Sequence, residues 1–341
     1  MSALSKLLEG KPLGKEEWLS LITDTKHAEE IREEACRKRD EIYGRKIFAR
    51  GLIEFTSFCR NDCYYCGIRC SNRNAGRYRL SSGTIFETVQ KGYEVGFRTF
   101  VLQGGEDPYF TDDRLIEIVS GIKASFPDSA VTLSVGERSY ESYEALRKAG
   151  ADRYLLRHET ADESHYMKLH PASMSFSNRV RCLHDLKKLG YQTGAGMMIG
   201  SPYSSYETLA EDMVFLSELK PEMVGIGPFI PHKDTPFRDN ERGSVELTLH
   251  MLSLVRLMNP HVLLPSTTAL GTADNLGHIK GFEAGANVIM PNLTPSGERE
   301  KYLLYDGKKI TEEEAGENIE MLRRELLEHG YELSLERGDY R

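Results

Sequence analysis

Hydrophobic and polar positions follow two different periods along this chain. Up to residue 48, apolar residues recur every three or four positions, as at Trp18, Leu21 and Ile22, which predicts helices with one buried face. From residue 49 onward, short apolar runs alternate with longer segments of helical period. We therefore expect an N-terminal helical extension, residues 1–48, followed by one α/β domain, residues 49–341.

The apolar runs predict strands at 49–56, 99–102, 130–135, 153–156, 192–199, 223–226, 261–265 and 287–290. The intervening helices are predicted at 82–95, 113–126, 140–149, 206–219, 247–258 and 275–284, with a broken helical region over 162–189. A last amphipathic helix is predicted over 312–329, with Ile319, Leu322, Leu326 and Leu327 on its apolar side. Strict strand–helix alternation of this kind predicts a (β/α)8 TIM barrel.

Composition narrows the possible partners. The chain has 341 residues, which fits one such barrel, and its net charge of −8 argues against nucleic acid. No apolar run approaches the roughly 20 residues that a membrane span needs, and the first residues lack the apolar core of a secretory signal. Of six cysteines, three lie in one short loop, which indicates a reduced cytoplasmic metalloprotein rather than a disulfide scaffold.

That loop carries the most specific chemistry in the chain. Cys59, Cys63 and Cys66 form a C-x3-C-x2-C motif. Three thiolates can bind three irons of a [4Fe–4S] cluster and leave the fourth iron open. A zinc site would require a fourth ligand, and Cys70, four residues further on, keeps that alternative open at this point.

The motif, with Tyr65 directly before its last cysteine, resembles the signature of the radical S-adenosylmethionine (SAM) enzymes. The resemblance implies that the open iron binds the amino and carboxylate groups of SAM, with Tyr65 near the adenine. It also implies reductive cleavage of SAM to a 5′-deoxyadenosyl radical, with an electron donor such as flavodoxin or ferredoxin.

In barrels of this type, chemistry gathers at the carboxyl ends of the strands. Gln103, Gly104, Gly105 and Glu106 end the second strand, where the glycines either admit a ligand to the backbone or make a tight turn. Thr132 and Ser134 alternate on the third strand, so both face the barrel interior as core hydroxyls or ligand donors.

The fourth strand ends in a charged cluster. Alternation predicts that Arg157 and Glu159 face inward and that His158 faces outward. Because buried charge requires a partner, we expect this pair to meet a ligand or each other. Arg179 is either a second carboxylate clamp or a solvated helix residue. His165 and His170 lack metal-ligand spacing and are interpreted as ordinary polar residues.

The remaining candidates lie on the later strands. Met197, in the run 194–198, either packs closely or forms a shelf for a flat adenine. Thr267, Thr268, Ala269 and Met290 are predicted to line the opposite side. Tyr302 lies just beyond the eighth strand and either closes the top of the barrel or packs the final crossover.

Longer stretches resemble the HydE-type maturases of [FeFe]-hydrogenase. These stretches are Ile-Glu-Phe before the loop and the segments 105–109, 151–160, 225–232 and 285–292. The resemblance implies SAM at the top of the barrel, contacted by Ser134, Glu159, Arg179 and the stretch 104–106. It also implies a deeper anion pocket in which Arg157, Thr267, Thr268 and Ala269 hold the carboxylate of a cysteine-derived substrate, with Tyr302 and Met290 nearby.

In that family the substrate is an iron–carbonyl–cyanide–cysteine complex supplied by a sister maturase, on the route to the hydrogenase H-cluster. Some members carry a second, peripheral cluster on cysteines after the eighth strand. This chain has no cysteine after Cys182, so we expect that cluster to be absent, and we interpret Cys36 as an ordinary buried thiol.

Three other functions share some of these features. Biotin synthase needs three further cysteines inside the barrel, and Cys36, Cys70 and Cys182 are not placed for this. A methylornithine synthase acting on lysine also needs a carboxylate clamp and is the main alternative. A non-catalytic cluster carrier would not need the SAM contacts of Glu159 and Arg179.

Overall fold

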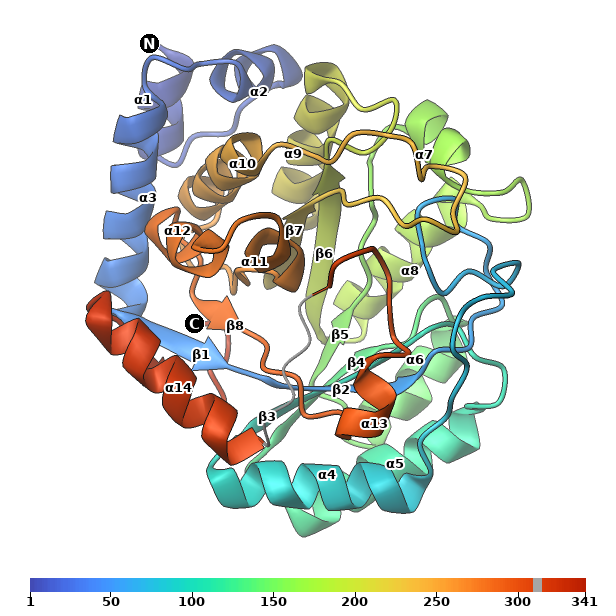
Figure 1. The fold of residues 1–341 in the computed structure, drawn as a ribbon. Helices are drawn as coiled ribbons and strands as arrows, with labels where there is room; N and C mark the ends of the chain where they lie inside the picture. The colour runs from blue at the N-terminus through green and yellow to red at the C-terminus, as the bar shows by residue number, and fades with distance from the viewer. Residues whose placement is uncertain (309–314) are drawn as a thin grey trace.

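A computed structural model describes residues 1–308 and 315–341 of the chain. Six parallel strands form its main sheet, and they neighbour one another in the order in which they occur along the chain (Figure 1). They are β2 (Gly51–Thr56), β3 (Thr99–Gly104), β4 (Ala130–Ser134), β5 (Arg153–Leu155), β6 (Gln192–Ile199) and β7 (Met223–Pro228). This order, with helices between the strands, is that of a TIM barrel.

Beyond β7, isolated β-bridges continue the barrel back to β2. Met223 bridges to Leu263, Pro265 bridges to Val288 in β8 (Val288–Ile289), and Asn292 bridges back to Leu52 in β2. The predicted strand 261–265 therefore contributes bridges rather than a full ladder, and β8 is shorter than predicted. Proline explains part of this, because Pro265 has no N–H group to donate.

Helices lie between the strands and surround them (Figure 1). They are α4 (Ser82–Val95), α5 (Asp112–Ser125), α6 (Tyr140–Lys148), α7 (Glu163–Leu169), α8 (Phe176–Lys188), α9 (Tyr206–Leu219), α10 (Val245–Met258), α11 (Thr268–Ala273) and α12 (Gly277–Glu283). Serine begins several of them, because its hydroxyl accepts a hydrogen bond from an otherwise unpaired N–H group of the first turn. These N-cap residues are Ser81, Ser139, Ser175, Ser205 and Ser244.

The N-terminal extension is helical only as far as residue 43. It comprises α1 (Ala3–Leu8), α2 (Lys15–Ile22) and α3 (Ala28–Tyr43). Gly44, at φ 64°, ends α3, and Lys46–Ala49 forms strand β1 beside β8. The helical prediction for residues 1–48 was therefore too long, because a glycine in the left-handed region ends the helix.

Three elements follow β8. They are α13 (Ser296–Arg299), α14 (Ala315–Glu328) and β9 (Glu332–Ser334), which pairs with β1. Neither α13 nor β9 was predicted, and the predicted start of the last helix, 312–314, lies outside the described residues. Ile319 and Leu326 are buried, whereas Leu327 is 71% exposed, so the predicted apolar side is narrower than expected.

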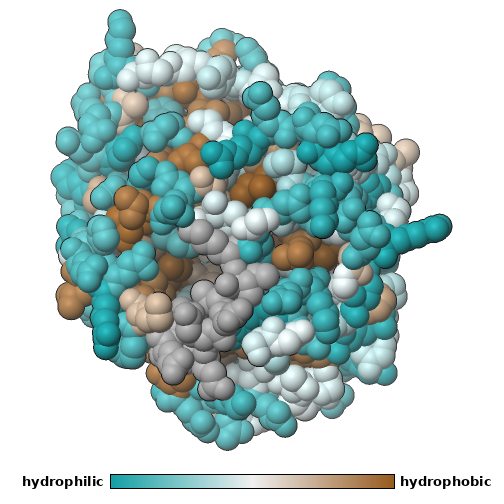
Figure 2. Space-filling view, in the orientation of Figure 1, coloured by the Kyte–Doolittle hydropathy of each residue, from teal (hydrophilic) through white to brown (hydrophobic). Residues whose placement is uncertain are grey.

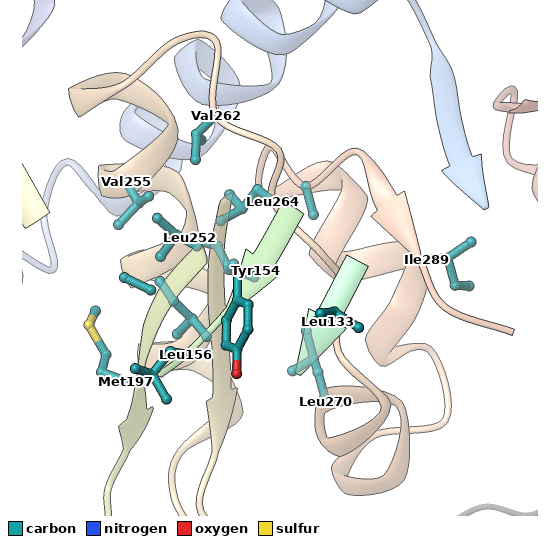
Figure 3. Close-up of a cluster of buried hydrophobic side chains, with 14 of the residues drawn as sticks. Leu133, Tyr154, Leu156, Met197, Leu252, Val255, Val262, Leu264, Leu270 and Ile289 are labelled. Atoms are coloured by element: carbon teal, nitrogen blue, oxygen red, sulfur yellow. The ribbon is translucent and has the colours of Figure 1, made fainter. Parts of the chain in front are cut away.

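The main core lies between the sheet and its helices. Figure 3 shows Tyr154 of β5 and Leu156, just after it, near Leu252 of α10, and Leu133 of β4 near Leu270 of α11. Seen from the side of Figure 1, the surface is mainly hydrophilic, with apolar residues in separate small groups (Figure 2). Among the helices that the structure describes, none is long and apolar enough to cross a membrane.

Candidate functional site

A cavity of about 300 Å³ opens at the carboxyl ends of the central strands. It brings together residues that the sequence analysis selected from widely separated segments. Those that line it are Cys59, Cys63, Tyr65, Cys66, Gln103, Gly104, Gly105, Glu106, Ser134, Arg157, Glu159, Arg179, Thr267, Ala269 and Tyr302. A neighbouring hollow of about 370 Å³ shares Glu106 but contains no cysteine. The cavity that holds the three thiols is therefore the candidate site.

Burial keeps these three thiols protonated as long as no metal binds them. Desolvation raises the pKa of Cys66 to about 12, and it also raises the pKa values of Cys59 and Cys63. Iron binding would release these protons, because the thiolate is the form that binds a metal. Within the described ranges, no three His, Cys, Asp or Glu side chains are grouped to hold a single metal ion. The three thiols line one cavity.

The other cysteines lie elsewhere. Cys70 is exposed and does not line the cavity, so the structure does not supply the fourth ligand that a zinc site would take from it. Cys36 contacts the guanidinium of Arg39 at 3.1 Å, and Cys182 is buried in α8.

Close neighbours require both glycines at the end of β3, the cysteine loop at Gly105 and the end of β2 at Gly104. A Cβ atom on Gly105 would lie 2.3 Å from the carbonyl oxygen of Phe58 and 2.6 Å from the Cβ of Cys59. A Cβ atom on Gly104 would lie 2.6 Å from the side chain of Thr56. Close packing therefore explains these glycines, and ligand contact by their backbone stays a prediction.

Glu106 connects the cysteine loop to the next strand end. Its Oε2 accepts a hydrogen bond from Arg60 Nε at 3.1 Å, and its Oε1 accepts one from the N–H of Glu137 at 2.8 Å. The carboxylate therefore ties the loop to the segment after β4.

Arg157 and Glu159 face each other as predicted, with 3.2 Å between Nη2 and Oε2. His158 points the other way, into the helix layer, where its ring lies beside Phe215 of α9. Neither Glu159 Oε2 nor Arg157 Nε has a hydrogen-bond partner among the described residues, although the two charges are close. Unpaired buried polar atoms are rare in folded proteins, so these two mark a place where a ligand would complete the hydrogen bonding.

Arg179 is 7% exposed, which rules out the solvated-helix alternative. Its Nε donates to Glu137 Oε1 and its Nη1 donates to the carbonyl oxygen of Arg157, each at 2.5 Å. Glu137 was not predicted as a site residue, although its position just after the polar end of β4 indicates one.

Four selected residues do not line the cavity. Met197 was predicted at the site, but its neighbour Met198 lines the cavity instead. Met197 points into the apolar cluster of Figure 3. Thr132 faces inward but deeper, in register with Arg153, and its hydroxyl has no partner among the described residues. Thr268 starts α11 directly after the N-cap Thr267. Met290 packs against a buried cluster that includes Phe48, Met223 and Val288.

Tyr65 is held in place by a histidine. Its hydroxyl lies 3.1 Å from Nε2 of His170, whose Nδ1 lies 2.9 Å from the carbonyl oxygen of Tyr166. His165 is also buried, with Nε2 2.9 Å from the carbonyl oxygen of Pro202. Both histidines have main-chain partners, as expected for polar residues of the framework. The wall also includes residues that the sequence analysis did not select, namely Leu155, Leu156, Pro228, Phe229, Ile230 and Leu304.

Comparison with known proteins identifies the family. Residues 53–216 match the Radical SAM superfamily. The chain is 48% identical to the [FeFe] hydrogenase maturase subunit HydE of Thermotoga maritima, over 79% of this chain and 77% of that protein. This chain is a radical SAM enzyme of the HydE family. It is also 31% identical to 3-methylornithine synthase of Methanosarcina barkeri, over 88% of this chain and 85% of the relative.

Solved structures agree on the fold. The crystal structure of methylornithine synthase (PylB) has a TM-score of 0.85, with 28% identity over 98% of this chain and 97% of the other. HydG, another [FeFe]-hydrogenase maturase, has a TM-score of 0.82 at 20% identity, over 98% of this chain and 75% of its own, and shows the fold alone.

The cofactors of a radical SAM enzyme of the HydE family are a [4Fe–4S] cluster and SAM. The residues of this cavity fit both groups. Three buried thiols would hold the cluster, which matches its preference for thiolate ligands. The unsatisfied Oε2 of Glu159 and the hydroxyl of Ser134 lie on the same cavity wall, where they suit the polar groups of SAM.

Proposed function

We propose that this chain acts in assembly of the [FeFe]-hydrogenase H-cluster, on a cysteine-bound iron carbonyl/cyanide complex. The observation that carries the proposal is Arg157, whose side chain lines the cavity and is 31% exposed although its guanidinium lies 3.2 Å from Glu159. A partly exposed guanidinium in a cavity matches a carboxylate such as that of the cysteine in the complex. The sequence identity to HydE supports the same substrate class.

When bound, the cluster and SAM supply a 5′-deoxyadenosyl radical by one-electron reduction. The protein's own contribution is placement. Cys59, Cys63 and Cys66 hold the cluster, and Ser134, Glu159 and Arg179 orient SAM on the side of β4 and β5. Arg157, with Thr267 and Ala269 from the start of α11, binds the substrate carboxylate.

The fixed position of Arg157 supports an anionic substrate. The two carboxylates that line the cavity are already matched, Glu106 by Arg60 and Glu159 by Arg157. Arg157 also donates to the carbonyl oxygen of Met197 at 2.7 Å, which fixes its guanidinium while the side chain stays 31% exposed. An incoming carboxylate would thus meet a guanidinium that is held in a fixed position.

The proposal implies partners. A sister maturase would supply the organometallic substrate, and a small electron carrier such as flavodoxin or ferredoxin would reduce the cluster.

The test uses Arg157→Ala and Arg157→Lys, with Arg181→Ala as a matched control on an exposed arginine of α8. Loss of the guanidinium should weaken substrate binding by about 2–5 kcal/mol, because it leaves a desolvated carboxylate poorly paired. Hydrogenase maturation should fall in Arg157→Ala and be only partly recovered in Arg157→Lys, while all variants keep their iron. An Arg157→Ala protein that retains its cluster and matures hydrogenase at the parent rate contradicts the clamp.

The second candidate is a methylornithine synthase acting on lysine, which the similarity to that enzyme over nearly the whole chain favours. Anaerobic SAM cleavage assays with and without lysine separate the two functions. Turnover of lysine by a parent enzyme that never supports maturation would establish the second candidate.

A further inference from the structure

The cysteine loop is held together by one arginine outside the motif. Arg77 is partly buried, and its guanidinium donates four hydrogen bonds to main-chain carbonyl oxygens. Nη1 donates to Ser57 and, at 2.8 Å, to Ile68. Nη2 donates to Arg69 at 2.7 Å and to Asn72 at 3.2 Å.

These acceptors lie on both sides of the three cysteines. Ser57 precedes Cys59 by two residues, whereas Ile68 follows Cys66 by two. The guanidinium therefore closes the loop at its base, with the metal-binding thiols between the two anchored ends. A planar group with five fixed N–H donors suits this task, and an ammonium group would not reach acceptors on both sides in the same geometry.

The guanidinium also lies close to one of the three thiols. It binds the carbonyl oxygens of Ile68 and Arg69, two and three residues after Cys66, and this brings its positive charge to the end of the cysteine motif. Among the described residues, the hydrogen-bond acceptors of Arg77 are carbonyls and not carboxylates. Its positive charge is thus not neutralised by a side chain and acts on what the thiols bind.

We propose that Arg77 is a positioning residue for the iron–sulfur cluster, which fixes the loop around the three thiolates and raises the reduction potential of the cluster. Hydrogen bonds to the sulfurs and nearby charge are established determinants of such potentials. A reduced cluster carries one more negative charge than the oxidised one, so a fixed cation favours the reduced form.

The experiment compares Arg77→Gln and Arg77→Lys with Arg73→Gln, which removes the same charge from an exposed arginine of the same loop. Each protein is reconstituted anaerobically with iron and sulfide. Iron content, the rate of iron release to a ferrous chelator and the midpoint potential of the cluster are then measured. The measurements need neither SAM nor substrate, so their outcome is independent of the proposed substrate.

Arg77→Gln should release iron about ten-fold faster than the parent, as is typical when a residue supporting metal ligands is lost, and its potential should be more negative. Arg77→Lys keeps the charge but not the four contacts, so it should release iron faster while its potential stays closer to that of the parent. Arg73→Gln should match the parent in both measurements.

The proposal is overturned if Arg77→Gln and Arg73→Gln release iron at the same rate and have the same potential. If Arg77→Gln does not accumulate as folded protein, Arg77→Lys provides the test. Iron release from Arg77→Lys at the parent rate also overturns the positioning role.

Discussion

Nε2 of His158 lies 3.1 Å from Oδ1 of Asp212, and both side chains are buried behind the segment after β5 that carries Glu159. Nδ1 of the same ring accepts a hydrogen bond from the N–H of Gly196 at 3.2 Å, so Nε2 carries the proton and donates it to Asp212. Asp212 also accepts from the N–H of Ala161 at 2.5 Å. The pair thus fixes the backbone on both sides of Glu159.

Glu159 needs this support because its φ of 67° lies in the left-handed region, which is unfavourable for a residue with a side chain. His158→Leu removes the donor and leaves the Asp212 carboxylate buried, which should lower the free energy of unfolding by about 1–3 kcal/mol. SAM affinity should fall as well, because the Glu159 carboxylate is no longer held toward the cavity. His158→Gln keeps a donor, so its unfolding free energy and its SAM affinity should fall less than those of His158→Leu. Equal SAM affinity in parent and His158→Leu would contradict the bracing role.

The amount of bound iron should distinguish the cluster-binding cysteines from the other cysteines. Cys66→Ser removes a cavity thiol and should abolish most of the bound cluster iron after anaerobic reconstitution, since the sulfur ligand is lost. Cys70→Ser and Cys182→Ser should keep parent iron content, because neither thiol lines the cavity. Loss of most of the bound iron in Cys70→Ser would indicate that Cys70 is a fourth metal ligand, as in the zinc-site alternative.

A buried ion pair holds the segment after α13. Lys308 Nζ lies 2.5 Å from Glu54 Oε1, and these side chains are only 7% and 1% exposed. Lys308 also donates to the carbonyl oxygen of Tyr302 at 2.9 Å, next to the cavity. Lys308→Met should destabilise the protein by about 3–5 kcal/mol, because it leaves a buried carboxylate unpaired.

The double variant Glu54→Gln/Lys308→Met should recover a large part of that loss, since no buried charge remains. Thermal or denaturant unfolding of the single and double variants measures the coupling. Additive losses would show that the two groups do not interact.

His170 should make stability depend on pH. Burial lowers its pKa to about 3, whereas an unfolded chain has a histidine pKa of about 6.5. Between these values the unfolded state binds a proton that the folded state does not, so stability falls as the pH drops below about 6.5, by up to about 1.4 kcal/mol per pH unit. His170→Gln should flatten this dependence between pH 7.5 and 5, measured as the unfolding free energy at each pH. An unchanged slope would assign the effect to other groups.

The periodic pattern alone predicted most of the framework, because hydrophobic period is a local property. Strand β6 begins and ends where the sequence predicts, and so does α9. The wrongly predicted boundaries each have an identifiable structural cause. Gly44 ends α3 early, and β9 forms only because β1 offers a free edge. The segment 261–265 remains a set of bridges since Pro265 cannot donate a ladder hydrogen bond.

The cysteine motif needed no tertiary information, because its three ligands and the aromatic residue lie within one short loop. Alternation likewise predicted that Arg157 and Glu159 face inward. It failed at Met197, where a shift of one residue exchanges the cavity face for the core face.

The sequence by itself therefore determined the alternating α/β framework, the thiol loop and the polar strand ends. Only the tertiary structure decided the partners that hold this site. Arg179 meets Glu137 across 42 positions of the chain, and Lys308 meets Glu54 across 254. The four carbonyls bound by Arg77 could not be predicted either, because carbonyl groups occur in every residue. Such pairings depend on how the loops close over the barrel, and no local period or spacing encodes that closure.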